Sequence, residues 1–277
     1  MRIRDALQQA RAAGVERLDA QLMLAQVFEQ PRTWLVAHDE VEFAPVQLTR
    51  WNEQLRRRAN GEPLAYVTGR CEFRGMQLQV SPAVLVPRPE TELLVEWALE
   101  LLPLYGNDEV VDLGTGSGAI ALALQRERPH ARVTATDASA DALPVARTNA
   151  ARHAPAVAFA PGDWWAAVAG RRFALAVSNP PYVAGDDPHL AALAHEPRMA
   201  LTPEGDGLAA LHHIVNAAPA HLLPGAWLLL EHGHDQGEAV RGLLAARGFV
   251  ATSTRLDLAG LPRCSGGRWP GSTRGAN

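Results

Sequence analysis

Residues 110–118 are Val-Val-Asp-Leu-Gly-Thr-Gly-Ser-Gly, a short apolar run that leads directly into three alternating glycines. The apolar run predicts a buried β-strand, and the pattern of residues 119–126 predicts the helix that follows it. Glycine adopts backbone conformations closed to other residues, so it permits a tight turn and lets a ligand lie against the backbone. This stretch therefore predicts the strand–loop–helix unit of an α/β fold, with a binding site at the loop.

Strands and helices continue to alternate beyond this unit. Apolar runs predict strands over 132–137, 157–159, 173–178 and 227–231, and periodicity predicts helices over 138–151, 209–218 and up to residue 246. Such alternation implies a parallel sheet with helices on both faces. Ligands of these folds bind outside the carboxyl ends of the strands, where the motifs described below fall.

The first seventy residues have a helical pattern instead, with apolar side chains recurring every three to four positions. One of these helices is predicted over 46–59, and it ends in Arg56, Arg57 and Arg58. Cations at that end suit the negative end of the helix dipole. The alternative is that the three arginines contact an RNA-bearing partner.

Residues 71–87 change to an alternation of apolar and polar side chains, which predicts a short β-hairpin. The C-terminal tail from residue 265 is rich in Gly, Ser and Arg, and we expect its end to be disordered. We therefore expect a helical domain over 1–70, a β-hairpin linker over 71–87 and an α/β domain over 88–277.

The composition limits the class of protein. A net charge of −4 gives no support for a broad nucleic-acid-binding surface, and we expect no direct nucleic-acid substrate. Two distant cysteines without a CxxC pair argue against a zinc site or a disulfide framework. The chain begins without a signal-peptide pattern and has no apolar run long enough to span a membrane. We expect a cytoplasmic protein with no membrane partner and, because no histidine group has a recognised ligand spacing, no metal.

The spacing of the glycine-rich loop indicates which cofactor it holds. The dinucleotide pattern is G-x-G-x-x-G, and its helix N-terminus binds a pyrophosphate. Here the spacing is G-x-G-x-G, and Asp112 stands two positions before the first glycine. A carboxylate there would repel a phosphate but attract the ammonium group of a methionine moiety. The loop thus favours S-adenosylmethionine over a nucleotide cofactor, and the candidate binding residues are Gly114, Thr115, Gly116, Ser117 and Gly118.

Two further strand ends carry candidate cofactor residues. Asp137 ends the second strand, where a carboxylate can accept hydrogen bonds from both hydroxyls of a ribose. The alternative is that Asp137 or Ser139 caps the next helix. Asp163 and Trp164 follow the third strand, where Asp163 would bind the adenine amino group and Trp164 would stack on the ring. The alternative for this pair is a loop acid beside a partly buried tryptophan.

Asn179, Pro180, Pro181 and Tyr182 end the fourth strand. The prolines fix φ and remove two backbone donors, so the carbonyls of Asn179 and Pro180 face something other than a neighbouring strand. One side-chain and one main-chain acceptor, rigidly held, match the two hydrogens of a single planar NH2 group. We expect all four residues to bind this group, with Tyr182 covering its flat face and Asn179 also contacting the cofactor.

The chemistry of a planar nitrogen explains why such acceptors are needed. An amide or aromatic amine nitrogen shares its lone pair with a π-system and is a poor nucleophile. Accepting both N–H bonds aligns the nitrogen and stabilises the positive charge that grows during attack on a methyl group. Asn179, Pro180 and Tyr182 are therefore the candidate catalytic residues. The motif alone leaves a glutamine amide and an adenine open, and the rival interpretations are an adenine N6-methyltransferase of DNA or RNA and a non-catalytic cofactor-binding protein.

One more segment precedes the α/β region. Residues 88–92, Arg-Pro-Glu-Thr-Glu, are expected to close over the cofactor, with Glu90 or Thr91 facing its methionine end. The alternative is an ordinary helix start with acids in its first turn.

Over nearly its whole length the chain resembles the bacterial release-factor glutamine N5-methyltransferases. The matching residues are 61–64, 66–69, Phe73, 85–92, 112–121, 163–164, 178–182 and 229–233. The Asn-Pro-Pro-Tyr motif is shared with adenine N6-methyltransferases, whereas its combination with Pro-Arg-Pro-Glu-Thr-Glu and a helical N-terminal domain is far more specific. His195 stands where the family often has phenylalanine, and residues 269–277 extend past the usual end.

The resemblance implies both a fold and an activity. The fold is that of the class I S-adenosylmethionine-dependent methyltransferases, α/β and Rossmann-like, with a mainly parallel seven-stranded sheet, a small N-terminal helical domain and a β-hairpin linker. The activity is methylation of the glutamine amide in the Gly-Gly-Gln motif of class I peptide chain release factors, which the helical domain helps to hold. By matching position, the glycine loop, Asp137 and Trp164 bind the cofactor, and residues 179–182 bind the glutamine.

Overall fold

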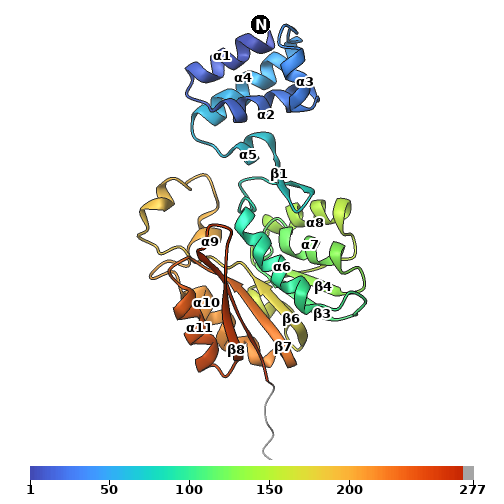
Figure 1. The fold of residues 1–277 in the computed structure, drawn as a ribbon, viewed down its shortest axis with the longest axis vertical. Helices are drawn as coiled ribbons and strands as arrows, with labels where there is room; N and C mark the ends of the chain where they lie inside the picture. Colours follow the sequence, from blue (N-terminus) through green and yellow to red (C-terminus); the bar gives the residue numbers. More distant parts are fainter. Residues whose placement is uncertain (271–277) are drawn as a thin grey trace, which may run out of the picture. The chain divides into compact units, whose positions relative to one another are not determined.

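The computed structural model describes residues 1–270, and the chain divides into two compact units, Met1–Arg70 and Cys71–Asn277 (Figure 1). The prediction that the end of the tail is disordered falls on residues 271–277, which lie outside the described residues. Across residues 1–270, no helix combines the length and the apolar character needed to cross a membrane.

The N-terminal unit is helical, as its periodicity predicted. Its helices are α1 (Ile3–Ala12), α2 (Arg17–Phe28), α3 (Arg32–Ala37), α4 (Pro45–Ala59) and α5 (Leu64–Thr68). Their inward faces form one core around the fully buried side chains of Ile3, Met23, Leu24 and Trp51. The helix α4 begins one residue before its predicted start, because Pro45 occupies the first helical position, where its missing N–H costs nothing.

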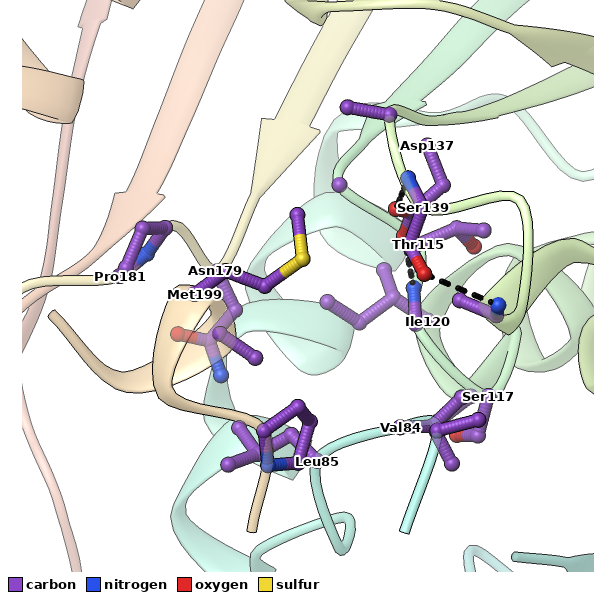
Figure 2. Close-up of a pocket in the computed structure, with 18 of the residues that line it drawn as sticks. Val84, Leu85, Thr115, Ser117, Ile120, Asp137, Ser139, Asn179, Pro181 and Met199 are labelled. Atoms are coloured by element: carbon purple, nitrogen blue, oxygen red, sulfur yellow. Dashed lines mark hydrogen bonds between the residues drawn. The ribbon is translucent and has the colours of Figure 1, made fainter. Parts of the chain in front are cut away.

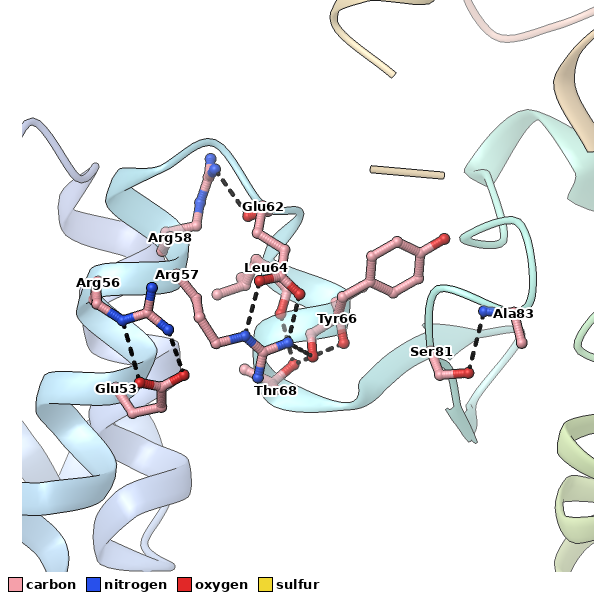
Figure 3. A network of polar contacts seen from close by, with 11 residues as sticks. Glu53, Arg56, Arg57, Arg58, Glu62, Leu64, Tyr66, Thr68, Ser81 and Ala83 are labelled. Atoms are coloured by element: carbon pink, nitrogen blue, oxygen red, sulfur yellow. Dashed lines mark hydrogen bonds and ion pairs between the residues drawn. The ribbon is translucent and has the colours of Figure 1, made fainter. Parts of the chain in front are cut away.

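The arginine triplet closes α4 (Figure 3). Each guanidinium forms an ion pair within the same unit: Arg56 with Glu53, Arg57 with Glu62 and Arg58 with Asp19. Arg57 also donates to the carbonyl of Tyr66 at 3.0 Å. These pairs use all three cations inside the helical unit, which favours the helix-end interpretation over a contact with RNA.

The larger unit is built on a seven-stranded sheet with the order β5-β4-β3-β6-β7-β9-β8. Its strands are β3 (Glu109–Leu113), β4 (Arg132–Asp137), β5 (Ala158–Pro161), β6 (Phe173–Ser178), β7 (Leu222–Glu231), β8 (Val250–Leu256) and β9 (Pro262–Arg268). Strands β3 to β7 pair in parallel, whereas β9 is antiparallel to both of its neighbours. The mainly parallel seven-stranded sheet implied by the resemblance is confirmed.

Helices cover both faces of this sheet (Figure 1). The first face packs against α6 (Glu92–Leu101), α7 (Ala119–Glu127) and α8 (Ala142–His153), and the second against α10 (Ala209–Ala217) and α11 (Gly237–Ala246). Shorter turns are η1 (Pro89–Thr91), η2 (Trp164–Val168), η3 (Pro188–Ala191), α9 (Arg198–Leu201) and η4 (Ala218–Ala220). Successive residues of β3 serve opposite faces, since Val110 belongs to the first core and Val111 to the second.

The predicted hairpin is shorter than expected. The strands β1 (Arg70–Phe73) and β2 (Met76–Gln79) form a two-stranded sheet. The apolar residues Val84 and Leu85 belong to no strand, because the segment after β2 contains prolines, which cannot donate to a ladder. This segment instead reaches the cavity described below.

Two strands, β8 and β9, were not predicted from the pattern, and β9 extends into the tail that is rich in Gly, Ser and Arg. Residues 265–268 form the second half of β9, which pairs with β7 and β8. Gly266 is needed there for close packing and not for flexibility, because a Cβ at this position would lie 2.5 Å from the side chain of Leu229. The first residues of this tail therefore belong to the sheet, and the predicted disorder concerned only its end.

Candidate active site

A cavity opens at the carboxyl ends of β3, β4 and β6 (Figure 2). It contains about 1010 Å³ of space, part of it open to solvent. Nine predicted site residues line it: Gly114, Thr115, Gly116, Ser117, Asp137, Asp163, Trp164, Asn179 and Pro181. Three others, Gly118, Pro180 and Tyr182, do not. Asn179 and Asp137 lie on opposite sides of the cavity in Figure 2.

The glycine loop has a backbone conformation that other residues rarely adopt. The φ angle is +74° at Gly114, +55° at Gly116 and +88° at Gly118. A Cβ on Gly114 would lie 2.9 Å from Cζ3 of Trp164, so the missing side chain lets the indole rest against the loop. Gly118 instead precedes α7, and a Cβ there would approach Leu122 at 3.2 Å. Its role is therefore helix packing, away from the cavity wall.

Asp112 lies behind this loop and is fully buried. Its Oδ2 accepts hydrogen bonds from the Thr115 hydroxyl at 2.6 Å and from the backbone N–H of Ala121 at 3.3 Å, whereas Oδ1 has no partner among the described residues. Burial raises the pKa of Asp112 to about 7, and the two hydrogen bonds oppose this shift. Because the side chain does not line the cavity, any attraction for an ammonium group acts across the loop that Asp112 holds.

Asp137 ends β4 and lines the cavity. Its Oδ2 accepts from the N–H of Gly116 and its Oδ1 from the N–H of Ser139, both at 2.8 Å (Figure 2). Burial raises the pKa of Asp137, while these hydrogen bonds lower it. Each oxygen keeps a lone pair for a ligand hydroxyl. The residue that caps the next helix, α8, is Ser139, whose Oγ accepts from the N–H of Ala142 at 3.1 Å.

Asp163 and Trp164 form another part of the wall. Trp164 opens η2 with φ at +41°, an uncommon conformation for a residue other than glycine. Its indole is held against Gly114, which explains how this conformation is maintained. Asp163 is exposed, and its side chain makes no capping bond to η2, so its carboxylate is available to a ligand.

Asn179 follows β6, and its amide is oriented by a residue distant in sequence. Its Nδ2 donates to the Thr91 hydroxyl oxygen at 3.3 Å, which leaves Oδ1 as an acceptor. Within residues 1–270, no hydrogen bond is donated to the main-chain carbonyl of Asn179 or of Pro180. Thr91 is buried and lines the cavity, whereas Glu90 is exposed and does not line it. The segment before α6 therefore does reach the cavity, through Thr91.

Tyr182 was expected to lie on the cavity wall, but it does not line the cavity. Its side chain is directed instead toward a buried carboxylate behind the wall. Its hydroxyl donates to Oε1 of Glu231 at 3.2 Å, and its carbonyl accepts from Nε2 of Gln236 at 2.9 Å. Glu231 ends β7 and is 1% exposed. Burial raises the pKa of Glu231 to about 7, although the Thr91 hydroxyl and the Arg263 guanidinium act in the opposite direction.

The sequence did not predict the part of the wall formed by the segment before Arg88 and by the start of α9 with the residue before it. The lining residues there include Val84, Leu85, Pro197 and Met199, and Arg88 of the expected segment 88–92 lies beside them on the wall. The buried Glu196 joins the two segments, because it accepts from the N–H of Val86 at 3.1 Å and pairs with the Arg88 guanidinium. His195, the departure from the family pattern, is exposed and leaves these contacts intact.

The histidine that follows Glu231 belongs to the core. His232 is fully buried, with Nδ1 at 2.7 Å from the carbonyl of Gly233 and Nε2 at 2.8 Å from Oγ of Ser265. Burial lowers the pKa of His232. In the part of the chain that the structure describes, no group of three or more His, Cys, Asp or Glu side chains is placed to hold a metal ion.

Comparisons with known proteins give a consistent result. The family model "PrmC N-terminal domain" matches residues 2–69, and "Methyltransferase small domain" matches residues 90–220. The release factor glutamine methyltransferase of Burkholderia pseudomallei is 48% identical over 94% of this chain and 95% of its own length, and that of Bordetella pertussis is 49% identical over 92% and 95%. A methyltransferase structure from Pyrococcus furiosus has a TM-score of 0.55 at 20% identity, covering 72% of this chain and 91% of its own, and this likeness concerns the fold alone. The chain therefore belongs to the release factor glutamine methyltransferase family.

Proposed function

We propose that this protein transfers a methyl group from S-adenosylmethionine to the side-chain amide nitrogen (N5) of the glutamine in the Gly-Gly-Gln motif of class I peptide chain release factors. The observation that carries the proposal is the pair of free acceptors after β6. Asn179 lines the cavity, and Pro180 stands between the two lining residues Asn179 and Pro181; neither Oδ1 of Asn179 nor the carbonyl of Pro180 accepts a hydrogen bond from the described residues. Two fixed acceptors match the two hydrogens of one amide NH2 group.

The wall opposite Asn179 fits S-adenosylmethionine. Asp137 would accept the ribose hydroxyls with its remaining lone pairs, while Asp163 and Trp164 would bind the adenine. The open backbone of the glycine loop would hold the methionine part, and a pyrophosphate there would face the carboxylate of Asp137, with Asp112 buried behind the loop. When bound, S-adenosylmethionine supplies a methyl group already activated by its sulfonium sulfur.

The residues after β6 would then act by positioning and electrostatics. Both N–H groups of the glutamine amide point at fixed acceptors, which directs the nitrogen lone pair and stabilises the charge that develops on nitrogen. The nitrogen would gain the methyl group as the methyl–sulfur bond breaks, with S-adenosylhomocysteine as the leaving group, and it would lose one of its protons to solvent. Pro181 keeps the loop rigid and forms part of the wall, and Tyr182 supports the loop from behind through its hydroxyl.

The helical unit, in this proposal, holds the release factor while the glutamine enters the cavity. Support comes from the match of residues 2–69 to the N-terminal domain of the family and from the two relatives over nearly their whole length. The ion-paired arginines of α4 give no matching support for a nucleic-acid substrate. The proposed place of action is the cytoplasm, where release factors work.

The test is transfer from labelled S-adenosylmethionine to a purified class I release factor, with mass spectrometry of the Gly-Gly-Gln tryptic peptide. We expect a gain of one methyl group on the glutamine and none on a release factor in which that glutamine is alanine. Adenine-containing DNA and RNA are offered in parallel. Label in nucleic acid and none in the release factor would reverse the assignment of substrate.

A further inference from the structure

Residues 183–200 form the loop that follows the acceptor residues, and a single side chain anchors it. Every residue of this loop is at least partly exposed except Glu196, whose side chain is 2% exposed. A loop that buries only one residue would ordinarily bury an apolar one, because a buried carboxylate is unfavourable unless it is paired and hydrogen-bonded. The burial of Glu196 therefore indicates that its contacts matter for the place of the loop.

The two oxygens of Glu196 bind two different groups of one other segment, residues 84–88. Oε2 accepts from the N–H of Val86 at 3.1 Å, and Oε1 pairs with the Arg88 guanidinium. Within residues 1–270, the main chain of residues 85–87 makes no backbone–backbone hydrogen bond. Glu196 therefore ties this segment to the loop, although the two lie about a hundred positions apart in the chain.

Both segments that Glu196 joins line the cavity. Leu85 reaches it from the segment 84–88, and Met199 reaches it from the loop (Figure 2). The prolines next to the anchor points, Pro87 and Pro197, line it as well. Glu196 itself does not line the cavity, so it acts on this wall from behind. A link at this place makes one wall out of two segments that would otherwise move separately.

The same link continues to the acceptor Asn179. The carbonyl of Arg88 accepts from the N–H of Thr91 at 3.1 Å, at the start of η1. Thr91 is buried, and its hydroxyl oxygen accepts from Nδ2 of Asn179 at 3.3 Å. The path from Glu196 to Asn179 thus consists of an ion pair, a turn and a side-chain hydrogen bond, each of them a direct contact. A shift of Arg88 would move Thr91 and, with it, the amide that Thr91 contacts.

We propose that Glu196 is a positioning residue of the methyl transfer, which clamps the loop 183–200 onto the segment 84–88 and so fixes both the cavity wall and the place of Thr91. This inference rests on the proposed function, because the wall borders the space where cofactor and glutamine would meet. The position requires a carboxylate. A glutamine side chain would turn its NH2 group toward either the N–H of Val86 or the guanidinium of Arg88, and both of these are donors.

The test begins with Glu196→Gln, which keeps the shape and breaks one of the two contacts. Whichever contact is lost, the loop should open from the segment more often, so we expect the protection of the Val86 amide against hydrogen exchange to fall by about 10-fold. The kcat for release factor methylation should fall by about 10- to 100-fold, because a small displacement of positioning groups is costly for the rate. Unchanged protection of Val86, or a kcat within twofold of the wild type, would overturn the inference.

Arg88 supplies the second arm. Arg88→Met leaves the carboxylate of Glu196 buried without its cation, so this variant should lose thermal stability. Adding Glu196→Gln removes the unpaired charge and should recover part of that stability, while kcat stays as low as in the slower single variant. Recovery of kcat together with stability would leave Glu196 with a structural role only, and fully additive losses would contradict the clamp. Because the double variant is the more stable one, it tests the inference even if Arg88→Met does not fold.

Glu109→Gln is the matched control. Glu109 also binds two donors, Arg132 at 2.6 Å and Arg171 at 2.9 Å, but it lies at the start of β3, at the opposite end of that strand from the cavity. This variant should keep the wild-type kcat and the protection of Val86, and an equal loss of kcat in it would refute a specific role for Glu196. Wild-type protein that transfers no methyl group to the release factor would refute the proposed function itself, whereas wild-type transfer with an unaffected Glu196→Gln variant would refute only this inference.

Discussion

Two opposite walls of the cavity are each backed by one fully buried carboxylate, and the two carboxylates hold different things. Asp112 lies behind the glycine loop and accepts from the Thr115 hydroxyl and the backbone of Ala121. Glu231 lies behind the acceptor loop, and its partner Tyr182 donates through a side chain. Asp112 therefore holds the glycine loop through the side chain of Thr115 and the start of α7 through its main chain, whereas Glu231 holds the acceptor loop through the side chain of Tyr182.

This difference separates binding from chemistry. The backbone of the glycine loop recognises the shape of a ligand, so a substitution in this loop should change the affinity for the cofactor. An acceptor such as Oδ1 of Asn179 acts on charge that develops during the reaction, so damage to it should change turnover. Substitutions in one wall should therefore change turnover and leave cofactor affinity nearly unchanged, and substitutions in the other wall should do the reverse.

Asn179→Ala removes one of the two acceptors, and we expect kcat to fall by about 10²- to 10³-fold, as for the loss of one preorganised polar contact to a developing charge. Affinity for S-adenosylhomocysteine should change by less than about threefold, because the ribose and adenine contacts lie on the other wall. The measurements are single-turnover methylation and calorimetry. Asn216→Ala, an exposed asparagine in α10, is the matched control and should behave as the wild type. If cofactor affinity falls as much as turnover, the two walls do not have separate roles.

Asp137→Ala should have the reverse effect. Hydrogen bonds to a charged group contribute about 1.5–3 kcal/mol, so we expect affinity for the cofactor to weaken by about 10- to 100-fold. At saturating cofactor kcat should recover to within a few-fold of the wild type. Asp141→Ala is the control, since this exposed carboxylate makes no capping hydrogen bond. If kcat stays low however much cofactor is added, Asp137 acts in the chemistry and the comparison fails.

The local parts of both walls could be predicted from the sequence. Apolar runs identified β3, β4 and β6, and polar residues directly after such runs must meet at one edge of a parallel sheet. The sequence thus predicted that Asp137 and Asn179 lie at one site, and both line the same cavity although they are far apart in the chain. It needed only the period of the strands and the chemistry of the residues at their ends.

The supporting contacts could not be predicted, because each joins segments that no periodicity connects. Thr91 and Asn179 are separated by 88 positions, and Glu231 and Tyr182 by 49. The same limit applied to β9, which no pattern predicted and where the close packing of Leu229 requires Gly266. A residue type shows what a side chain can do, and only the packing shows which partner it has.

Gly114→Ala is a smaller change in the glycine loop, and it tests whether this wall of the cavity binds the cofactor. The new Cβ would lie 2.9 Å from Trp164, so the indole must shift, and the loss of one aromatic contact should weaken cofactor affinity by about 3- to 10-fold. Gly170→Ala is a close control, because Gly170 has a similar φ of +76° but no neighbour within 4 Å of a Cβ. Both variants should lose stability from the strained backbone, by about 1–2 kcal/mol, and only Gly114→Ala should lose affinity. Equal affinities would show that Trp164 does not bind the cofactor.

The smallest predicted effect is a dependence on pH. Burial raises the pKa of Glu231 to about 7, and the groups that face it are Arg263 and Cys264 from β9, Glu90 from η1, and Tyr182. If the ionised form of Glu231 is the one that holds Tyr182 and the loop that carries Asn179, kcat at saturating cofactor should rise about threefold between pH 6.5 and 7.5, as a single titration near 7 requires. The Glu231→Gln variant should lack this rise.

Stability should change in the opposite direction over the same range. The folded pKa of Glu231 lies above its unfolded value, so between about pH 4.5 and 7 the native state binds more protons than the unfolded state. The contribution of this group to the free energy of unfolding therefore falls as pH rises through that window, while turnover increases. Urea titrations at pH 5 and pH 8 should show a smaller fall for Glu231→Gln than for the wild type. Asp112→Asn should likewise reduce the fall, since burial also raises the pKa of Asp112 to about 7, but it should leave the pH dependence of kcat unchanged. A change in that dependence on replacing Asp112 would mean that the two buried carboxylates do not act separately.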